Sequence, residues 1–318
     1  MIHRTASDRL LGDVAISPLA ARAGAPSYEI HRAGLQRMLA DALGHGTIEF
    51  ERRCVAVRQD GGGVHAQFED GGEAHADILI GADGVHSAVR DAVLGPTQLR
   101  RAGIGVWRGM AEMGQDELPP GLHLRYLGPG GIFGIARLSD ELVRWYASAP
   151  FPARRPQSGG EYKQLALDSF NGWPQLVGVA LDRTDERDQL FNDTPHAPPF
   201  RTWGSGRITL LGDAAHCSVP TLGISAGLAI EDAAVLGECV RNAAGEISGL
   251  RAYERQRRRV SARAVRSAAL FGRILTIRRQ PAYTFRNIGA RLAPQRLAIR
   301  WLVAGARWHL PERESRAR

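Results

Sequence analysis

Apolar residues spaced as on one side of a helix follow Arg32. Leu35, Met38, Leu39 and Leu43 recur at intervals of three and four residues, which places their side chains on a common face of an α-helix. Glycines follow this run directly and are typical of helix ends. The pattern therefore predicts an amphipathic helix that begins near Arg32.

Short runs that alternate apolar and polar residues predict strands after this helix. Residues 48–58 alternate imperfectly, and Val64, Ala66 and Phe68 then share one face between two glycine-rich turns. Residues 76–80 form a short apolar run that ends in Gly-Ala-Asp-Gly. This is typical of a buried strand that leads into a loop.

The pattern changes over residues 100–200, where Gly, Pro and aromatic residues interrupt short apolar segments. We interpret this region as an antiparallel sheet with one helix at 161–170. A further apolar strand at 207–211 and long helices at 224–244 and 249–278 then follow. The last helix carries a loosely apolar side: Tyr253, Val260, Val265, Leu270 and Ile274.

The change in character predicts three segments along the chain. Residues 1–100 and 201–318 would form a discontinuous α/β domain, and residues 101–200 would form an inserted sheet domain. Residues 1–28 show no regular pattern and are expected to be irregular.

The net charge of +8 comes from one region of the chain. Residues 251–318 contain 18 Arg and 3 Glu, whereas the first 250 residues are net acidic. The chain has one lysine, Lys163, and no aromatic interleaving among its arginines, so we do not expect nucleic-acid binding. The arginines of the last helix are expected to form a solvated face.

Cysteine content and hydropathy indicate a cytoplasmic protein. Cys54, Cys217 and Cys239 form no CxxC pair, so zinc-site spacing is absent and no metal is expected. No apolar run is long enough for a membrane span, and no secretory signal is visible at the N-terminus.

Two segments share the order apolar strand, glycine, aspartate and helix. They are residues 78–90, with Asp83, and residues 208–236, with Asp213. Ligands of open α/β sheets bind beyond the carboxyl ends of strands, and an aspartate there accepts hydrogen bonds from sugar or ribityl hydroxyls. For either aspartate alone, a helix N-cap is the more common explanation. The occurrence of both favours a ligand site.

A loop rich in glycine lies between Asp213 and the long helix that follows. It reads Pro220-Thr-Leu-Gly223-Ile-Ser-Ala-Gly227. The N-terminus of a helix offers free N–H groups and a positive dipole, which suit an anionic group or a ring that becomes anionic. His216 and Cys217, just before this loop, are expected to pack rather than to bind metal.

These motifs resemble those of the FAD-dependent aromatic-ring hydroxylases, the single-component flavin monooxygenases of the p-hydroxybenzoate and salicylate hydroxylase type. The resemblance covers nearly the whole chain. It rests on YEIHRAGLQRMLADAL, GADGVHSAVR, ITLLGDAAHCSVPTLG with AIEDAAVL, and YERQRRR. It implies a Rossmann-like FAD-binding domain, N-terminally incomplete, with an inserted mixed or antiparallel substrate-binding sheet.

The resemblance also implies roles for individual residues. Arg32 would face the FAD diphosphate or ribityl chain, and Asp213 would bind the ribityl hydroxyls. Asp83 and Gly84 would support FAD and the approach of NADPH. The flavin ring would be bordered by Gly212, Pro220, Gly223, Ile224, Ser225, Ala226 and Gly227.

The activity implied is NADPH- or NADH-dependent hydroxylation of a small aromatic or related substrate with O2, through a flavin hydroperoxide. The protein would supply a dry pocket and orientation, as a monomer or homodimer. Arg108 and Tyr146 are the foremost candidates for substrate contacts, with Arg108 able to pair a carboxylate. The other candidates on the predicted sheet are His123, Arg137 and Trp145.

The sequence departs from the family pattern in two places. No GxGxxG occurs, so we expect the family's first βαβ unit to be absent and one sheet edge to be exposed. The usual Gly-Gln-Gly of the flavin loop reads Gly223-Ile224-Ser225, and Ser225 would be strained if that position required a positive φ.

Two alternatives remain open. The chain is a non-catalytic or fragmentary remnant of the flavin monooxygenase fold, or it is a serine hydrolase, because Gly223-Ile-Ser225-Ala-Gly227 matches G-x-S-x-G. A hydrolase would need a strand that leads directly into Ser225. It would also need an acid such as Asp232, and His309 is the only later histidine.

Overall fold

The computed structural model describes residues 1–14, 30–151 and 158–292. The chain divides into two compact units. Of the described residues, the first unit comprises 1–14, 30–45, 101–151, 158–194 and 272–292, and the second comprises 46–100 and 195–271. No helix in the described ranges is both long enough and apolar enough to cross a membrane.

A seven-stranded sheet forms the body of the first unit. Its strands are β1 (Ile2–Thr5), β2 (Leu10–Asp13), β7 (Arg100–Glu112), β8 (His123–Leu127), β9 (Ile132–Arg137), β10 (Leu142–Pro150) and β11 (Leu190–His196). The spatial order is β11-β7-β10-β9-β8-β1-β2. Strands β7 to β10 pair antiparallel, and β1 lies parallel to β8. The sheet is therefore mixed.

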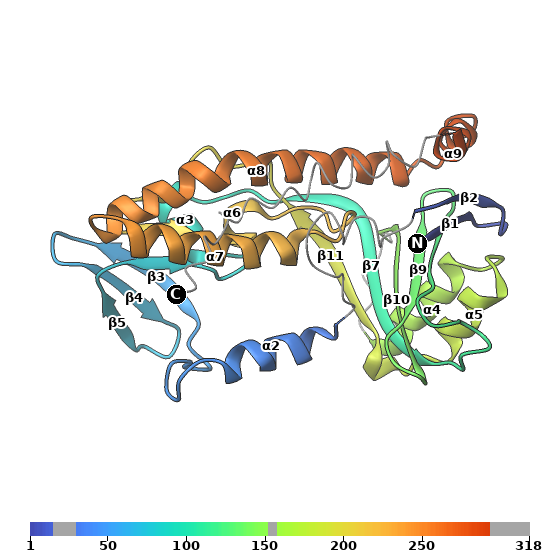
Figure 1. The fold of residues 1–318 in the computed structure, drawn as a ribbon, viewed down its shortest axis with the longest axis horizontal. Helices are drawn as coiled ribbons and strands as arrows, with labels where there is room; N and C mark the ends of the chain where they lie inside the picture. Colours follow the sequence, from blue (N-terminus) through green and yellow to red (C-terminus); the bar gives the residue numbers. More distant parts are fainter. Residues whose placement is uncertain (15–29, 152–157, 293–318) are drawn as a thin grey trace, which may run out of the picture. The chain divides into compact units, whose positions relative to one another are not determined.

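Helices cover one face of this sheet. The helices of this unit are α2 (Arg32–Asp41), α4 (Gly159–Ser169), α5 (Gln175–Asp182), a 3-10 turn at Glu186–Asp188, and α9 (Ala282–Leu292). Figure 1 shows α4 and α5 against the strands. The core between them contains Trp107, Phe133, Trp145, Phe170 and Val177. The other sheet face carries the polar side chains described below.

The second unit contains two three-stranded sheets and long helices. Its strands are β3 (Cys54–Gln59), β4 (Val64–Phe68), β5 (Glu73–Ala76), β6 (Leu79–Gly81), β12 (Gly204–Ser205) and β13 (Ile208–Leu210). Its helices are α3 (Ala88–Leu94), α6 (Asp213–His216), α7 (Ser225–Asn242) and α8 (Glu246–Leu275). Strands β13 and β6 are parallel, so the Gly212 and Gly81 ends lie at one edge.

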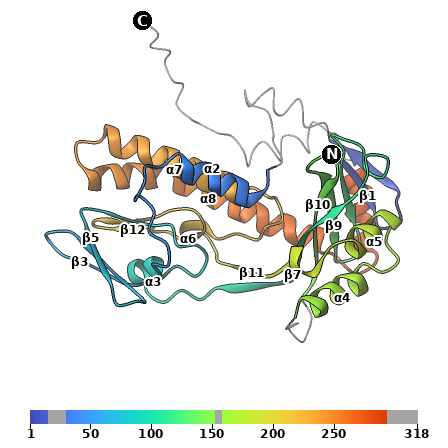
Figure 2. The ribbon, with the colours of Figure 1, turned by 90° about the horizontal axis from the view of Figure 1, so that it is seen from below.

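The views in Figures 1 and 2 both show α7 and α8 side by side. The buried side of α8 contains Leu250, Tyr253, Ser261, Ala264, Val265 and Ala268. Leu270 and Ile274, which we predicted on the apolar side, are 46% and 38% exposed. The buried face is instead formed in part by the small residues Ser261, Ala264 and Ala268. A search for large apolar residues at helical spacing does not detect such a face.

We predicted that residues 1–28 would be irregular. This is wrong for residues 1–14, which form the hairpin β1–β2. Each strand has four residues, too few to show an alternation in the sequence. Asp8 takes a positive φ of 62° in the connecting turn, a conformation that aspartate tolerates better than most residues. The rest of the 1–28 segment, from residue 15, lies outside the described residues.

The sequence predicted one helix in the inserted region, and the structure contains two. Helix α4 occupies the predicted position. Helix α5 was missed, although Val177, Ala180 and Leu181 bury one helical face. Gly178 and the β-branched valines weaken helix propensity there, and packing against the sheet overrides it.

Candidate functional site

Glycines at two strand ends bring backbone close to neighbouring elements in the second unit. A Cβ at Gly81 would lie 2.6 Å from Val89 and 2.9 Å from Leu210. Gly212 has φ 60° and ψ −139°, and a Cβ there would lie 3.2 Å from Ala229. Only glycine fits these positions without strain. Gly212 opens the Asp213 loop, defined here as residues 211–224, which lie between β13 and α7 and include the short helix α6.

The Asp213 loop presents an acceptor and donors that protein groups do not use. Asp213 is exposed, and its carboxylate has no hydrogen bond or ion pair with any described residue. Gly223 takes a φ of 68° with open space where a Cβ would stand. Helix α7 starts without a side-chain cap, which leaves its first N–H groups available to an anion.

A buried charge network lies behind this loop and consists of His216, Glu231, Asp232 and Arg257. Asp232 is fully buried, and its Oδ2 accepts from the Gly212 N–H at 3.2 Å and from His216 Nε2 at 2.5 Å. Its Oδ1 accepts from Arg257 Nε at 2.7 Å. Asp232 thereby fixes the backbone that precedes Asp213.

Arg257 balances two buried carboxylates in this network. Its Nη2 lies 2.7 Å from Glu231 Oε2. Burial by itself would lower the pKa of Arg257, but the hydrogen bond and charge of Asp232, with those of Glu231, raise the pKa above its usual value. The guanidinium therefore stays charged. His216 is buried as predicted, and no metal role is needed to explain it.

Ser225 does not need a positive φ, contrary to the strain that we considered. It is the first residue of α7, and Gly223 carries the positive φ of this loop. The Ser225 hydroxyl lies 3.0 Å from that of Ser218. No strand leads directly into Ser225, because β13 ends at Leu210. The described residues thus give the hydrolase alternative no support, and His309 lies outside them.

Asp83 caps the helix that follows it. Its carboxylate accepts from the Ser87 hydroxyl and, at 3.1 Å, from the Val89 N–H. Ser87 in turn caps α3 through the Arg90 N–H at 2.8 Å. Gly84 takes a φ of 80° between them. The N-cap of α3 is thus Ser87 rather than Asp83, but the Asp83 carboxylate is engaged at the start of this helix. Its ligand role remains a prediction, whereas Asp213 has no such engagement with a described residue.

The other predicted flavin contacts lie at the start of α2, in the Asp213 loop and at the start of α7. Arg32 is the first residue of α2, in the first unit, and is exposed. Pro220 is also exposed. The adjacent Thr221 donates from its hydroxyl to the Ala268 carbonyl at 2.7 Å, which attaches the Asp213 loop to α8. Ile224, Ala226 and Gly227 complete the entrance to α7.

A sheet-face cluster lies on the face of the seven-stranded sheet away from α4 and α5. It consists of Arg108, His123, Arg125, Arg144 and Tyr146. Register places Arg125, Gly134, Tyr146 and Arg108 in one cross-strand row, and residues so paired share a face. Arg125 Nε donates to the Tyr146 hydroxyl at 2.7 Å, and that oxygen lies 3.5 Å from His123 Nε2.

Gly134 is what allows this arrangement. A Cβ there would lie 2.2 Å from the Tyr146 ring, so the ring lies flat across β9 only because the position has no side chain. The phenol oxygen then reaches Arg125 on the next strand. The sequence alone did not identify Arg125, although its alternation with the core residues Leu124 and Tyr126 places it on the polar face.

The cluster holds its histidine neutral. Burial, then the charges of Arg125 and Arg144, lower the pKa of His123 to about 3. Neighbouring His3 has a pKa lowered to about 4 by burial and Arg125. The pKa of Arg108 is also lowered, by partial burial and the charge of Arg32. No carboxylate among the described residues pairs with Arg108 or Arg125. The electrostatic character of this face suits an anionic ligand.

Two predicted substrate contacts are structural instead. Trp145 points to the helix-covered face, is 1% exposed and donates to the Thr184 hydroxyl at 2.8 Å. Arg137 donates to five backbone carbonyls that hold neighbouring loops together. Alternation within β10 explains the difference, because Trp145 and Tyr146 are consecutive and must face opposite sides.

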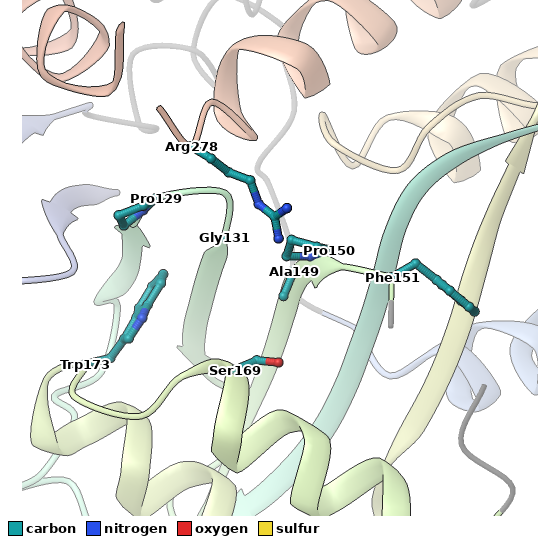
Figure 3. A pocket seen from close by; sticks show the side chains of 8 residues that line it. All are labelled: Pro129, Gly131, Ala149, Pro150, Phe151, Ser169, Trp173 and Arg278. Carbon is teal, nitrogen blue, oxygen red and sulfur yellow. The ribbon is translucent and has the colours of Figure 1, made fainter. Parts of the chain in front are cut away.

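A pocket of about 390 Å³ lies elsewhere in the first unit, near the end of β10. Figure 3 shows the Arg278 guanidinium directed toward Ala149 and Pro150, with Ser169 and Trp173 below it. The stem of Arg278 lies over Gly130, where a Cβ would be 2.5 Å away. The pocket contains none of the predicted site residues.

Comparison with known proteins identifies the family. A family described as "FAD binding domain" matches residues 24–268. The chain belongs to this family. The resemblance to FAD-dependent aromatic-ring hydroxylases, the fold class and the cofactor are thereby confirmed. The boundaries between the segments at 1–100, 101–200 and 201–318 remain a prediction.

Individual relatives of this FAD-binding chain are similar over most of its length. A FAD-dependent urate hydroxylase of Klebsiella pneumoniae is 32% identical over 243 residues, which are 76% of this chain and 63% of that protein. The aurachin C monooxygenase/isomerase of Stigmatella aurantiaca is 32% identical over 72% of this chain and 60% of its own length. The match therefore spans less than two thirds of either relative.

Solved structures give the same grouping. The HpxO protein of Klebsiella pneumoniae, complexed with FAD and uric acid, has a TM-score of 0.89 and 28% identity, covering 96% of this chain and 80% of its own. A salicylate hydroxylase at 22% identity shares the fold, with a TM-score of 0.73 over 96% of this chain.

The residues of the Asp213 loop fit a flavin cofactor. The Asp213 carboxylate is an open acceptor for ribityl hydroxyls, and the uncapped start of α7 offers donors to the electron-rich side of a flavin ring. Gly223 leaves open space beside that helix end. FAD is the group that this chemistry suits.

Proposed function

We propose that this chain belongs to a FAD-dependent, NAD(P)H-consuming monooxygenase that hydroxylates a small, planar, acidic ring compound. The observation that carries the proposal is the free Asp213 carboxylate beside an uncapped α7, in a sequence of the FAD-binding family. Bound FAD would accept electrons from NAD(P)H and would activate O2. The proposal includes a cytoplasmic monomer or homodimer and small-molecule partners only.

Asp213 and the α7 entrance would hold the cofactor. Asp213 would accept hydrogen bonds from ribityl hydroxyls, and the N–H groups of Ser225 to Gly227 would donate to the ring where negative charge develops. Asp232 would not touch the cofactor but would position Gly212 through its backbone hydrogen bond. Arg32, whose guanidinium has no ion pair with a described residue, would bind phosphate.

The sheet-face cluster would bind and orient the substrate. Arg108 and Arg125 carry charges that no described carboxylate compensates, so a substrate anion would be stabilised there. Tyr146 accepts a hydrogen bond from Arg125 and lies 3.5 Å from His123 Nε2, so its hydroxyl would be held in place to donate to a substrate acceptor.

The substrate class follows from this chemistry. A neutral His123 adds a hydrogen-bonding group without a further charge, and the flat Tyr146 ring offers an aromatic surface. A ring anion with several acceptors matches this set. Urate, which the names of several relatives include, is the first compound to try.

The first test is flavin binding by the purified chain. FAD added to the protein should remain bound on gel filtration and give the spectrum of a protein-bound flavin, while Asp213→Ala should weaken FAD binding at least tenfold. Asp91→Ala, on the exposed side of α3, is the matched control and should change nothing. A chain that binds no FAD at millimolar concentration would support the remnant alternative.

The second test concerns the substrate. With FAD bound, urate should stimulate NAD(P)H oxidation and yield hydroxylated product. Arg125→Gln should raise KM for an anionic substrate about tenfold. Arg101→Gln, an exposed arginine of β7 paired with Asp193, is the control and should leave KM unchanged. Equal effects of the two variants would contradict a substrate role for Arg125.

A further inference from the structure

A groove in the second unit is lined by arginines and by no acidic side chain. It has a volume of about 380 Å³. Its lining residues are Pro199, Phe200, Arg201, Arg258, Arg259, Ala262, Arg263 and Arg266. None of them belongs to the Asp213 loop, the buried charge network or the sheet-face cluster, so the proposed roles above leave the groove without a function.

One side of α8 supplies four of these arginines. Arg258, Arg259, Arg263 and Arg266 fall within about two turns, over a length of roughly 12 Å. They lie opposite the buried residues of this helix, such as Ser261. Arg259 and Arg263 are four residues apart, and like charges at this spacing destabilise a helix. An anion in the groove would relieve that repulsion.

The groove arginines lack the carboxylate partners that Arg251 and Arg257 have on the same helix. Arg251 pairs with Glu254, and Arg257 pairs with Glu231 and Asp232. In the groove, only Arg258 has a partner among the described residues, donating from Nη1 to the Arg201 carbonyl at 2.6 Å. The remaining groove guanidiniums have no hydrogen bond or ion pair within the described ranges. Helix α8 therefore compensates its buried charges and leaves the groove cationic.

The aromatic wall of the groove connects it to the start of α6. The Arg90 guanidinium lies 5.7 Å from the centroid of the Phe200 ring. Arg90 is buried, and its Nη1 donates to the Ala214 carbonyl at 3.4 Å. Arg90 thus links Phe200 to the helix that begins with Asp213, and the groove belongs to the same unit as the Asp213 loop.

We propose that this groove binds the clustered phosphates of the dinucleotide reductant, with the 2′-phosphate of NADPH among them. Guanidinium forks match phosphate oxygens in pairs, and Phe200 offers an apolar surface for a base. The short reach of the cluster suits a few phosphates on one nucleotide better than a nucleic-acid backbone. The choice of NADPH rests on the proposed function, whereas the preference for clustered phosphates does not.

The test measures binding of 2′,5′-ADP to the full chain by calorimetry, without FAD. We expect binding that weakens as salt rises and that exceeds binding of 5′-AMP at least tenfold. The double variant Arg259→Gln with Arg263→Gln should weaken 2′,5′-ADP binding about a hundredfold, at about tenfold for each charged contact.

Arg255→Gln is the matched control. Arg255 is exposed on the same helix and carries the same charge but does not line the groove, so its variant should bind within about threefold of the unaltered chain. Far-UV circular dichroism should show the same helix content for every variant. An equal loss in Arg255→Gln would mean that only net charge matters and would overturn the proposal.

Two further outcomes would overturn it. No binding of 2′,5′-ADP at millimolar concentration would exclude the site. Duplex DNA that binds more tightly as its length grows, and displaces 2′,5′-ADP, would make the groove a nucleic-acid surface instead. Because the assay contains no FAD, a chain that binds 2′,5′-ADP but not FAD would retain this inference and lose the proposed function.

Discussion

The charged side chains behind Gly212 are buried and paired with opposite charges. The charged side chains on the open face of the seven-stranded sheet are mainly arginines, and Arg108 and Arg125 have no carboxylate partner among the described residues. Asp232 and Glu231 share Arg257 at 2.7 Å each. On the sheet, Arg125 donates to the Tyr146 hydroxyl and its guanidinium lies 5.7 Å from the centroid of that ring, and no carboxylate among the described residues pairs with it. The charges of the first cluster are paired with one another, and the second has cations that no described carboxylate pairs.

This difference separates a positioning role from a binding role. A buried charge is tolerated only when it is paired, so the network behind Gly212 contributes rigidity to the Asp213 loop and nothing to ligand affinity directly. Cations held together without an anion destabilise the unliganded protein. Such uncompensated cations are typical of ligand sites, where binding of an anion offsets their mutual repulsion.

The substitution Asp232→Asn tests this difference with the largest expected effect on stability. Arg257, His216 and the Gly212 N–H would all lose their shared carboxylate while the side-chain shape stays the same. Removing one member of a buried ion pair costs about 3–5 kcal/mol. Urea unfolding should therefore show a loss of about 3 kcal/mol in the free energy of unfolding.

Asp213→Asn is the control for that measurement. Asp213 is exposed and has no partner among the described residues, so the variant should unfold within about 0.5 kcal/mol of the unaltered chain without FAD. If Asp232→Asn were equally mild, the network would not be what fixes the loop, and the distinction between the two clusters would fail.

The free energy of unfolding should fall at acid pH because of His123 in the sheet-face cluster. His123 has a pKa lowered to about 3 in the folded chain, through burial and then Arg125, Arg144, the N-terminal amine and His3. In the unfolded chain the pKa returns to about 6.5, so the unfolded state binds more protons as pH falls. Stability is fully present above pH 6.5 and is lost as pH falls toward 3.

The expected size is about 1–2 kcal/mol lost between pH 7 and pH 5, allowing for the partial exposure of the ring. His123→Asn should flatten the dependence of unfolding free energy on pH over this interval. His45→Asn, an exposed histidine of the first unit, should leave the slope as it is. A slope unchanged by His123→Asn would show that the ring is not held neutral.

The Asp213 loop could be predicted from the sequence because its constraints are local. A strand end, two glycines and a helix start are read directly from consecutive residues, and the structure places Gly212, Gly223 and Ser225 accordingly. The sheet-face cluster could be predicted only in part. Tyr146 was named, but its partner Arg125 depends on strand order and on Gly134, which consecutive residues do not reveal.

Errors of prediction have the same origin. Trp145 and Arg137 have the residue types of ligand contacts, yet strand alternation and loop closure assign them to the core and to backbone carbonyls. The β1–β2 hairpin is held by its pairing with β8, a contact between residues more than a hundred positions apart. Such long-range partners override local patterns.

The smallest expected effect concerns Ser225, where the family pattern has glycine. Because Ser225 begins α7 with helical geometry, Ser225→Gly should relieve no strain. It should instead lose the hydrogen bond to Ser218 and gain backbone freedom, at a cost of about 0.5–1 kcal/mol. Thermal unfolding should show a slightly lower Tm, with Gly237→Ala in the middle of α7 as the opposite control. A higher Tm for Ser225→Gly would mean that Ser225 strains the α7 entrance after all.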